Sequence, residues 1–163
     1  MLQVKNSNRW LAIFLTVVTI SLVGCKDKNK PDGGGSFVGN KSKPAWVAPE
    51  VIDPNSSMTV VAKVDLTKNY AEAAKKAGWQ IADEDILAAF IGNTCLGAVN
   101  PKDGLFYLFI AAPETNGEAS ISLRYYSAKA SNYFVAKNVL TYQNDGRVGT
   151  PSEPFGPQFV VEQ

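Results

Sequence analysis

The sequence predicts an all-β domain, a single antiparallel β-sandwich with one short helix inserted near residues 70–77. Three observations support this prediction. Apolar and polar residues alternate with a period of two over residues 58–66 and again over residues 119–125, as they do in strands with one solvated face. Gly92-Asn93 separates two apolar runs and is typical of a tight hairpin turn. Prolines fall between the runs, where they remove no sheet hydrogen bond.

The expected strands account for most of the chain after residue 57. They lie at residues 58–66, 86–91, 94–99, 105–112, 119–125, 133–137, 139–143 and 158–162. About seven or eight such strands fit an immunoglobulin-like or jelly-roll-like sandwich, and the very apolar run 105–112 is expected at the centre of a sheet. A helix is expected because Asn69 and Glu72 match a capping box and Gly78 follows as a stop signal.

The first 24 residues have the pattern of a secretory signal. Lys5 and Arg9 precede the uncharged run 10–24, which is shorter than the roughly 20 residues that a membrane-spanning helix needs. The run ends directly before Cys25 with Leu22, Val23 and Gly24. This motif resembles the lipobox of bacterial lipoproteins. The resemblance implies cleavage before Cys25 and lipidation of its thiol by acyl chains that anchor the protein in a membrane. The alternative is an N-terminal anchor helix that is never cleaved.

The same resemblance implies an outer-membrane location, because Lys26 rather than Asp follows Cys25. It leaves open whether the protein lies on the periplasmic or the cell-surface face. Residues 25–45 are rich in Lys, Asn, Gly, Ser and Pro, a composition that predicts a flexible tether. Residues 46–163 are expected to form the β-sandwich domain, beginning with an extended lead-in over residues 46–57 that docks on the domain.

The composition excludes several classes of function. The chain has 16 Lys and Arg and 15 Asp and Glu, and cleavage of the signal would remove Lys5 and Arg9, so no basic face for nucleic acid is expected. The chain contains no histidine, which excludes Ser-His-Asp and Cys-His catalysis. If Cys25 is lipidated, Cys95 has no partner within the chain. We expect Cys95 to be a free thiol in an apolar strand; the alternative is an intermolecular disulfide.

A series of motifs extends over most of the mature chain: Asp53-Pro54, Ser57-Met58-Thr59, residues 85–98, Leu105-Phe106-Tyr107-Leu108, residues 121–126 and Val148-Gly149-Thr150-Pro151. In these motifs the chain resembles a small β-sandwich module found in secreted and lipid-anchored bacterial cell-surface proteins. The helical insertion and Leu96, which stands where a polar residue is frequent, depart from the pattern. The resemblance implies a surface binding or adhesion module and no catalytic residues.

Acidic residues offer two further candidate sites. Asp83, Glu84 and Asp85 form the densest acidic cluster, which makes Asp83 and Asp85 candidate calcium ligands. A solvated acidic turn is the favoured alternative, because three consecutive residues of an extended chain cannot all face one ion. No other cofactor is expected. A glycosidase would need two facing carboxylates. Only residue type supports the pair Asp85 and Glu118, so we do not expect an enzyme.

Aromatic side chains are the main candidates for ligand contacts, because flat rings with a polar tip stack well on sugars. The candidates are Trp79, Tyr125, Tyr126, Tyr133 and Tyr142, of which Trp79 and Tyr126 are favoured; the alternative is that these rings fill the core. The expected function is a non-catalytic binding or adhesion module of the cell envelope whose partner is a glycan or an envelope protein. The alternative is a structural or assembly subunit that pairs through an edge strand near the C-terminus.

Overall fold

The structure, a computed structural model, describes residues 35–50, 56–113 and 118–162. The predicted signal peptide, its lipobox and Cys25 lie outside the described residues, as does the motif Asp53-Pro54. These features therefore stay predictions. None of the helices in the described ranges is both long and apolar enough to cross a membrane.

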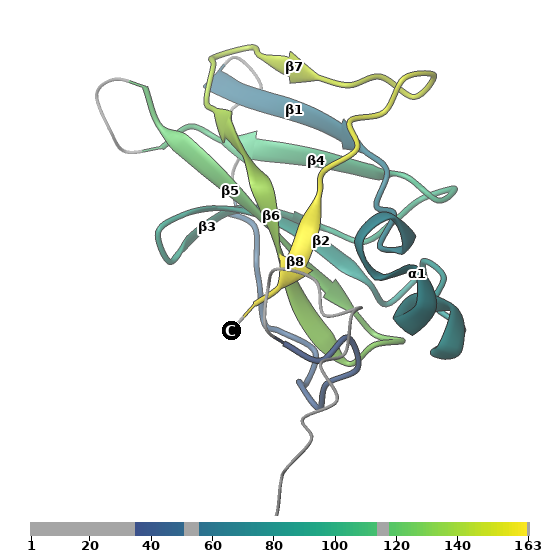
Figure 1. The fold of residues 1–163 in the computed structure, drawn as a ribbon. Coiled ribbons are helices and arrows are strands. Elements are labelled where there is room, and N and C mark those ends of the chain that lie inside the picture. The colour runs from purple at the N-terminus through teal and green to yellow at the C-terminus, as the bar shows by residue number, and fades with distance from the viewer. Residues whose placement is uncertain (1–34, 51–55, 114–117, 163) are drawn as a thin grey trace, which may run out of the picture.

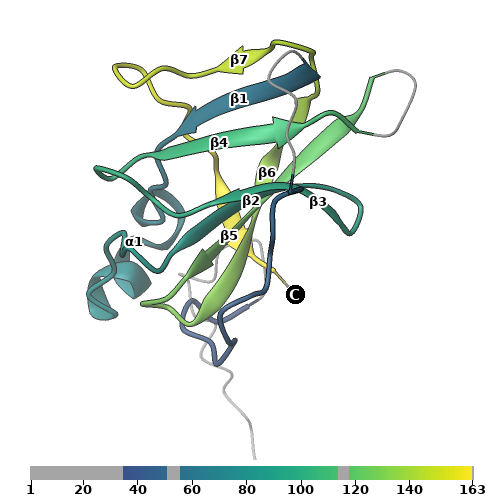
Figure 2. The same ribbon diagram turned by 180° about the vertical axis from the view of Figure 1, so that it is seen from behind.

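Two sheets and one short helix make up the domain, which confirms the predicted β-sandwich with a helical insertion (Figures 1 and 2). The larger sheet has the order β3-β2-β5-β6-β8. Its strands are β2 (Ile86–Ile91), β3 (Thr94–Val99), β5 (Ser120–Ser127), β6 (Asn132–Thr141) and β8 (Phe159–Val161). The smaller sheet has the order β4-β1-β7. Its strands are β1 (Ser57–Ala62), β4 (Phe106–Ala111) and β7 (Arg147–Val148). All pairs are antiparallel except β1 with β7, which run parallel.

Two strands differ from the sequence prediction. Residues 132–141 form one strand, β6, where two shorter strands were expected. The pairing of β6 with β5 shifts its register between Ser122 and Arg124, so β6 continues through the point where a break was expected. The apolar strand β4 lies at an edge of the smaller sheet and not at its centre. Its apolar character has another cause: Phe106, Leu108 and Ile110 point into the core and are completely buried.

The hairpin between β2 and β3 forms as predicted. Ile91 pairs with Thr94 across the turn, and Gly92 has a φ of +57°, a conformation that glycine adopts without steric cost. Further along β3, Gly97 allows the two sheets to touch. A Cβ atom at Gly97 would lie 2.1 Å from the carbonyl oxygen of Phe109 in β4. One side of the sandwich is therefore closed by direct contact between backbones.

The helix α1 (Thr67–Lys76) begins earlier than predicted and covers a sheet edge. The carboxylate of Asp65 accepts a hydrogen bond from the backbone N–H of Thr67 (3.0 Å), so Asn69 is not the capping residue and the predicted capping box is wrong. The Asn69 side chain instead donates to the carbonyl oxygen of Phe159 (2.8 Å), and the Tyr70 hydroxyl accepts from the N–H of Val161 (2.7 Å). The outer edge of β8, expected to be open for a partner, is therefore occupied by α1 at Phe159 and Val161.

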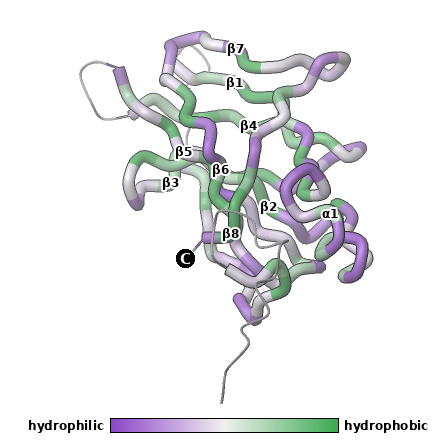
Figure 3. The backbone as a smooth tube through the Cα atoms, viewed as in Figure 1, coloured by the Kyte–Doolittle hydropathy of each residue, from purple (hydrophilic) through white to green (hydrophobic). Residues whose placement is uncertain are grey.

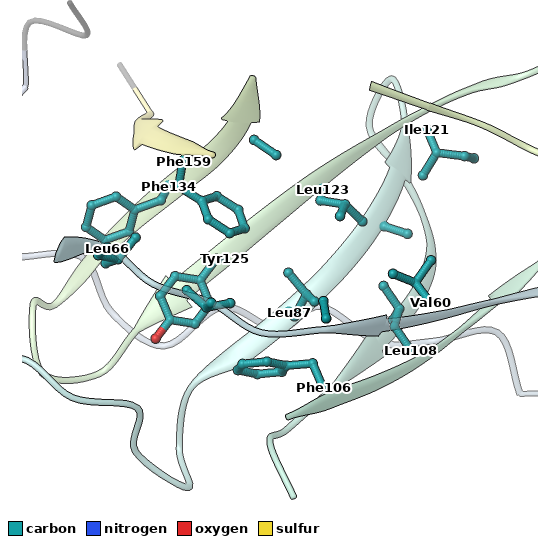
Figure 4. Packing of buried hydrophobic residues seen from close by; sticks show 14 of the residues in the cluster. Val60, Leu66, Leu87, Phe106, Leu108, Ile121, Leu123, Tyr125, Phe134 and Phe159 are labelled. Carbon is teal, nitrogen blue, oxygen red and sulfur yellow. The ribbon is translucent and has the colours of Figure 1, made fainter. Parts of the chain in front are cut away.

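The core lies between the two sheets. Its largest completely buried side chains come from both sheets and from the segment before α1 (Figure 4): they are Tyr125, Phe106, Phe134, Phe159, Leu66 and Leu87. Figure 3 shows that the hydrophobic stretches follow the strands, whereas α1 is largely hydrophilic. The helix therefore packs on the sandwich through few side chains, chiefly Tyr70 and Ala74.

The domain begins before residue 46. Phe37 is buried in the core (4% exposed), with its ring 5.5 Å from Tyr70 and 5.6 Å from Phe134. The amide of Asn132 donates to the carbonyl oxygens of Ser36 (2.8 Å) and Phe37 (3.3 Å). We call residues 36–46 the N-terminal strap. The sequence predicts a tether here because polar residues dominate. The structure differs because one aromatic ring and a few backbone hydrogen bonds are enough to dock the segment.

Candidate functional site: an aromatic cluster on the outer face of the larger sheet

The two aromatic side chains of strand β5 point to opposite faces of the larger sheet. Side chains alternate along a strand, so Tyr125 points into the core while Arg124 and Tyr126 point outward. Pairing then sets their neighbours: Tyr126 lies opposite Tyr133 of β6, and Ser122 of β5 lies opposite Phe90 of β2. The outer face of the sheet therefore collects Phe90, Arg124, Tyr126 and Tyr133 from three adjacent strands.

The strap adds a further ring to this face. The chain before residue 50 runs along the outer face of the larger sheet (dark blue in Figure 2), and the Trp46 ring lies 5.5 Å from both Phe90 and Tyr133. Tyr133 in turn lies 5.6 Å from Tyr126, and its hydroxyl donates to the carbonyl oxygen of Ser42 (2.7 Å). We call Trp46, Phe90, Arg124, Tyr126 and Tyr133 the outer-face cluster.

Arg124 supplies the charge of the cluster. Its guanidinium lies 4.5 Å from the centre of the Phe90 ring, a cation–π geometry. One terminal nitrogen, Nη2, donates to the carbonyl oxygen of Gly92 (3.3 Å), and Nε lies 3.5 Å from a carboxylate oxygen of Glu162. The arginine is thus held between the β2–β3 turn, an aromatic face and the C-terminal end of β8.

Exposure divides the rings into a supporting layer and a contact layer. Phe90 (3% exposed) and Tyr126 (6% exposed) are buried beneath their neighbours, whereas Trp46 and Tyr133 are half-buried. Burial raises the pKa of the Tyr126 phenol above its ordinary value, and the nearby Tyr133 and Asp85 add to the effect. Tyr126 therefore stays neutral and supports the cluster, and Trp46 and Tyr133 are the rings that a ligand can reach.

The other predicted aromatic residues lie elsewhere. Tyr125 is completely buried, with its ring 5.6 Å from Phe159 in the core, so its predicted place in a ligand platform is wrong. Trp79 is half-buried against the core and donates from its indole nitrogen to the hydroxyl of Ser127 (3.2 Å). Tyr142 is also half-buried against the core, and its hydroxyl donates to the carbonyl oxygen of Ser56 (2.7 Å). The favoured pair of Trp79 and Tyr126 does not form one surface.

The acidic cluster does not converge on a common point. Asp85 is completely buried, whereas Asp83 and Glu84 are exposed. The Asp85 carboxylate accepts hydrogen bonds from the Tyr125 hydroxyl, from the N–H of Ala82 (3.0 Å) and from the N–H of Ala128 (2.8 Å). Burial raises the pKa of Asp85 despite these donors, which act in the opposite direction. In the described ranges no three carboxylate or cysteine side chains gather as metal ligands. A calcium site at Asp83 and Asp85 stays an untested prediction.

Two further residues are placed by the structure. Glu118 precedes β5 and Asp85 lies beside the other end of that strand, so about 25 Å of strand separates them. This separation is too large for the carboxylate pair of a glycosidase.

Cys95 is half-buried, its thiol lies 3.5 Å from the carbonyl oxygen of Gly97, and burial raises the pKa of the thiol. An intermolecular disulfide at Cys95 stays untested.

Comparison with known proteins returned no match: no family model, no curated protein and no solved structure is significantly similar to this chain. The resemblance to lipid-anchored cell-surface modules therefore stays a prediction, and the site has to be argued from its own geometry.

Three of the five residues in the outer-face cluster follow from the sequence. Tyr126 and Tyr133 were predicted, and the alternation along β5 also placed Arg124 on the solvated face. Trp46 was read as part of the lead-in and Phe90 as part of a buried strand. Only the pairing of β2 with β5 and the course of the strap bring these two residues to the same face.

Proposed function

We propose that this chain is a lipid-anchored, non-catalytic binding module of the outer membrane, and that it binds glycan through the outer-face cluster. The observation that carries the proposal is the position of Trp46 and Tyr133, two adjacent rings outside the core with solvent on one side. Sugar rings have apolar faces that stack on such side chains, and hydroxyl groups that bond to nearby polar groups. Arg124 supplies a fixed charge beside them.

The architecture supports a binding role for this sheet. Phe90 and Tyr126 hold the contact rings from below, and Arg124 is fixed by three separate contacts. A preorganised surface of this kind loses little conformational entropy when a ligand binds. The immunoglobulin-like or jelly-roll-like topology of the sandwich is a separate proposal, and the binding role does not depend on it.

A glycan array tests the binding role. The wild-type chain should bind a defined set of glycans. Trp46→Ala or Tyr133→Ala should lower the affinity for these glycans at least tenfold. Trp79→Phe is the control, because Trp79 is another half-buried aromatic residue and lies away from the cluster. Binding that is lost in Trp79→Phe and retained in Trp46→Ala would contradict the assignment of the site to the outer-face cluster. An array without hits would contradict the proposal that the ligand is a glycan.

Fractionation of cells tests the anchor. The motif before Cys25 supports lipidation, so Cys25→Ser should move the mature protein out of the membrane fraction or leave an uncleaved precursor. Cys95→Ser is the control, because it removes the other cysteine and keeps the motif. Membrane partitioning of Cys25→Ser equal to that of the wild type would contradict the proposed anchor.

A further inference from the structure

The strap fixes the end of the domain from which the chain leads back to Cys25. Its backbone is bound to the turn between β5 and β6: the N–H of Gly39 donates to Ala130 (2.9 Å) and that of Lys41 donates to Ser131 (2.8 Å). Phe37 is buried between α1 and β6. Phe37 is the twelfth residue after Cys25, and a chain of this length spans about 40 Å when fully extended and roughly 20 Å as a coil. An anchor at Cys25 would keep this end of the domain near the bilayer.

The same end of the domain carries a group of exposed lysines. Lys41 lies on the strap, Lys129 lies in the β5–β6 turn, and Lys75 and Lys76 lie in the last turn of α1. The Lys129 side chain reaches to 4.0 Å from the position of a Cβ atom at Gly78, which follows α1 directly. Together with Lys43 of the strap, we call these five residues the basic end.

Nearby carboxylates reduce this charge without cancelling it. Asp83 and Glu84 are exposed in the loop before β2, which Asp85 ties to Ala128 of the β5–β6 turn. Glu72 of α1 is a third exposed carboxylate, one turn before Lys75 and Lys76. The five lysines outnumber these three carboxylates. At the far end of β5 and β6 the exposed charges include Glu118 and Asp145. Exposed Arg147 lies beside Asp145 there. The basic end itself carries more exposed lysines than carboxylates.

We propose that the basic end rests on anionic phospholipid headgroups, so that the membrane holds the domain in one orientation. This inference rests on the lipid anchor of the proposed function. A lysine close to an anionic bilayer strengthens the attraction about fivefold, and the effect falls off within a Debye length. The short connection to Cys25 allows the lysines to come within that range of the bilayer. The outer-face cluster then stands beside the bilayer, and β7 with the β6–β7 turn points away from it.

Lysine acetylation in vesicles tests the orientation. The lipidated full chain is inserted into vesicles of phosphatidylcholine alone or with phosphatidylglycerol, treated with an amine acetylating reagent and analysed by mass spectrometry. We expect the five lysines of the basic end to react at least threefold more slowly on the anionic vesicles. Lys63 and Lys137, which are exposed elsewhere, should react equally on both. Salt at about 0.5 M should abolish the difference, because the Debye length then falls to a few ångströms.

A charge-reversed pair completes the test. Lys75→Glu with Lys129→Glu should remove the protection of Lys41 and Lys76, whereas Lys63→Glu with Lys137→Glu should leave it unchanged. All four positions are exposed, so both variants should fold. Equal acetylation of the basic end on the two kinds of vesicle, by a chain that sediments with both, would overturn the orientation. A chain that sediments with neither kind of vesicle would overturn the lipid anchor itself.

Discussion

At the scale of single residues, Asp85 is a completely buried carboxylate that joins three parts of the fold. Both of its oxygens accept hydrogen bonds, and they join the loop before β2 to the β5–β6 turn and to Tyr125 in the core. We expect Asp85→Ala to lower the free energy of unfolding by about 3 kcal/mol, because it leaves buried donors without partners. Denaturant unfolding measures this loss. Asp83→Ala is the control, since Asp83 is exposed, and an equal effect of the two substitutions would contradict the role of Asp85.

The raised pKa of Asp85 also predicts a pH dependence. A carboxyl whose pKa is higher in the folded state adds stability below its unfolded pKa of about 4, and this stability is lost as the pH rises through the folded pKa. The stability of the wild type relative to Asp85→Asn should therefore fall as the pH rises from about 4. Unfolding curves of both proteins at several pH values measure the difference. A wild-type advantage that grows with pH would show that the donors outweigh burial.

Gly97 is a second residue with a steric role. A methyl group there would meet the carbonyl oxygen of Phe109 at 2.1 Å, and a backbone atom of another strand cannot move aside as a flexible side chain can. Gly97→Ala should lower the free energy of unfolding by about 3 kcal/mol. Gly156→Ala is the matched control, because the nearest atom to its added methyl is the end of the Lys68 side chain at 3.7 Å. Similar melting temperatures for both variants would contradict the close contact of β3 with β4.

At the scale of elements, α1 acts as a cover for an open sheet edge. An unpaired strand edge is a template for association with other chains, and α1 blocks it at β8 with the side chains of Asn69 and Tyr70. Tyr70→Phe should lower the free energy of unfolding by about 1–2 kcal/mol, because the N–H of Val161 loses its acceptor. Hydrogen exchange of that N–H should accelerate while Lys76→Ala, on the exposed face of α1, leaves it unchanged. Unaltered exchange in Tyr70→Phe would contradict the edge-covering role.

The sequence was informative about elements wherever a pattern is local. Alternation located β1 and β5, and Gly92-Asn93 located the turn of the β2–β3 hairpin. The prediction failed where long-range contacts decide. Nothing near Asn69 in the chain reveals that its amide bonds to Phe159, ninety residues away. The sequence of β4 also does not reveal that this strand lies at a sheet edge. A strand covered by a facing sheet and a strand at the centre of a sheet show the same apolar pattern.

The candidate site was predictable to the same extent. Tyr126 and Tyr133 stand out as aromatic residues among polar ones, and strand alternation gives their face. Trp46 could not be assigned, because the strap has no periodicity and its course over the sheet follows from the burial of Phe37 and the hydrogen bonds to the β5–β6 turn. A lone aromatic residue in a polar segment, such as Phe37, is the signal that would have predicted docking.

At the scale of the whole molecule, the strap joins three features that the sequence presents separately. Phe37 packs on Tyr70, which covers the edge of β8, and on Phe134 of the core. Trp46, at the other end of the strap, completes the outer-face cluster. Pulling the strap away would therefore expose a core cavity and dissolve the binding surface at once. The proposed anchor is attached to a part of the domain that the fold needs.

This dependence predicts where the chain can be shortened. A protein that starts at residue 36 keeps Phe37 and Trp46, and its free energy of unfolding should match that of one starting at residue 26 to within about 0.5 kcal/mol. A protein that starts at residue 47 loses the buried Phe37 ring and should be less stable by about 3–5 kcal/mol. Phe37→Ala in the longer protein separates the ring from the rest of the strap and should account for most of that loss. Equal stability of the two shortened proteins would mean that the domain begins at residue 47 and that the strap is only a tether.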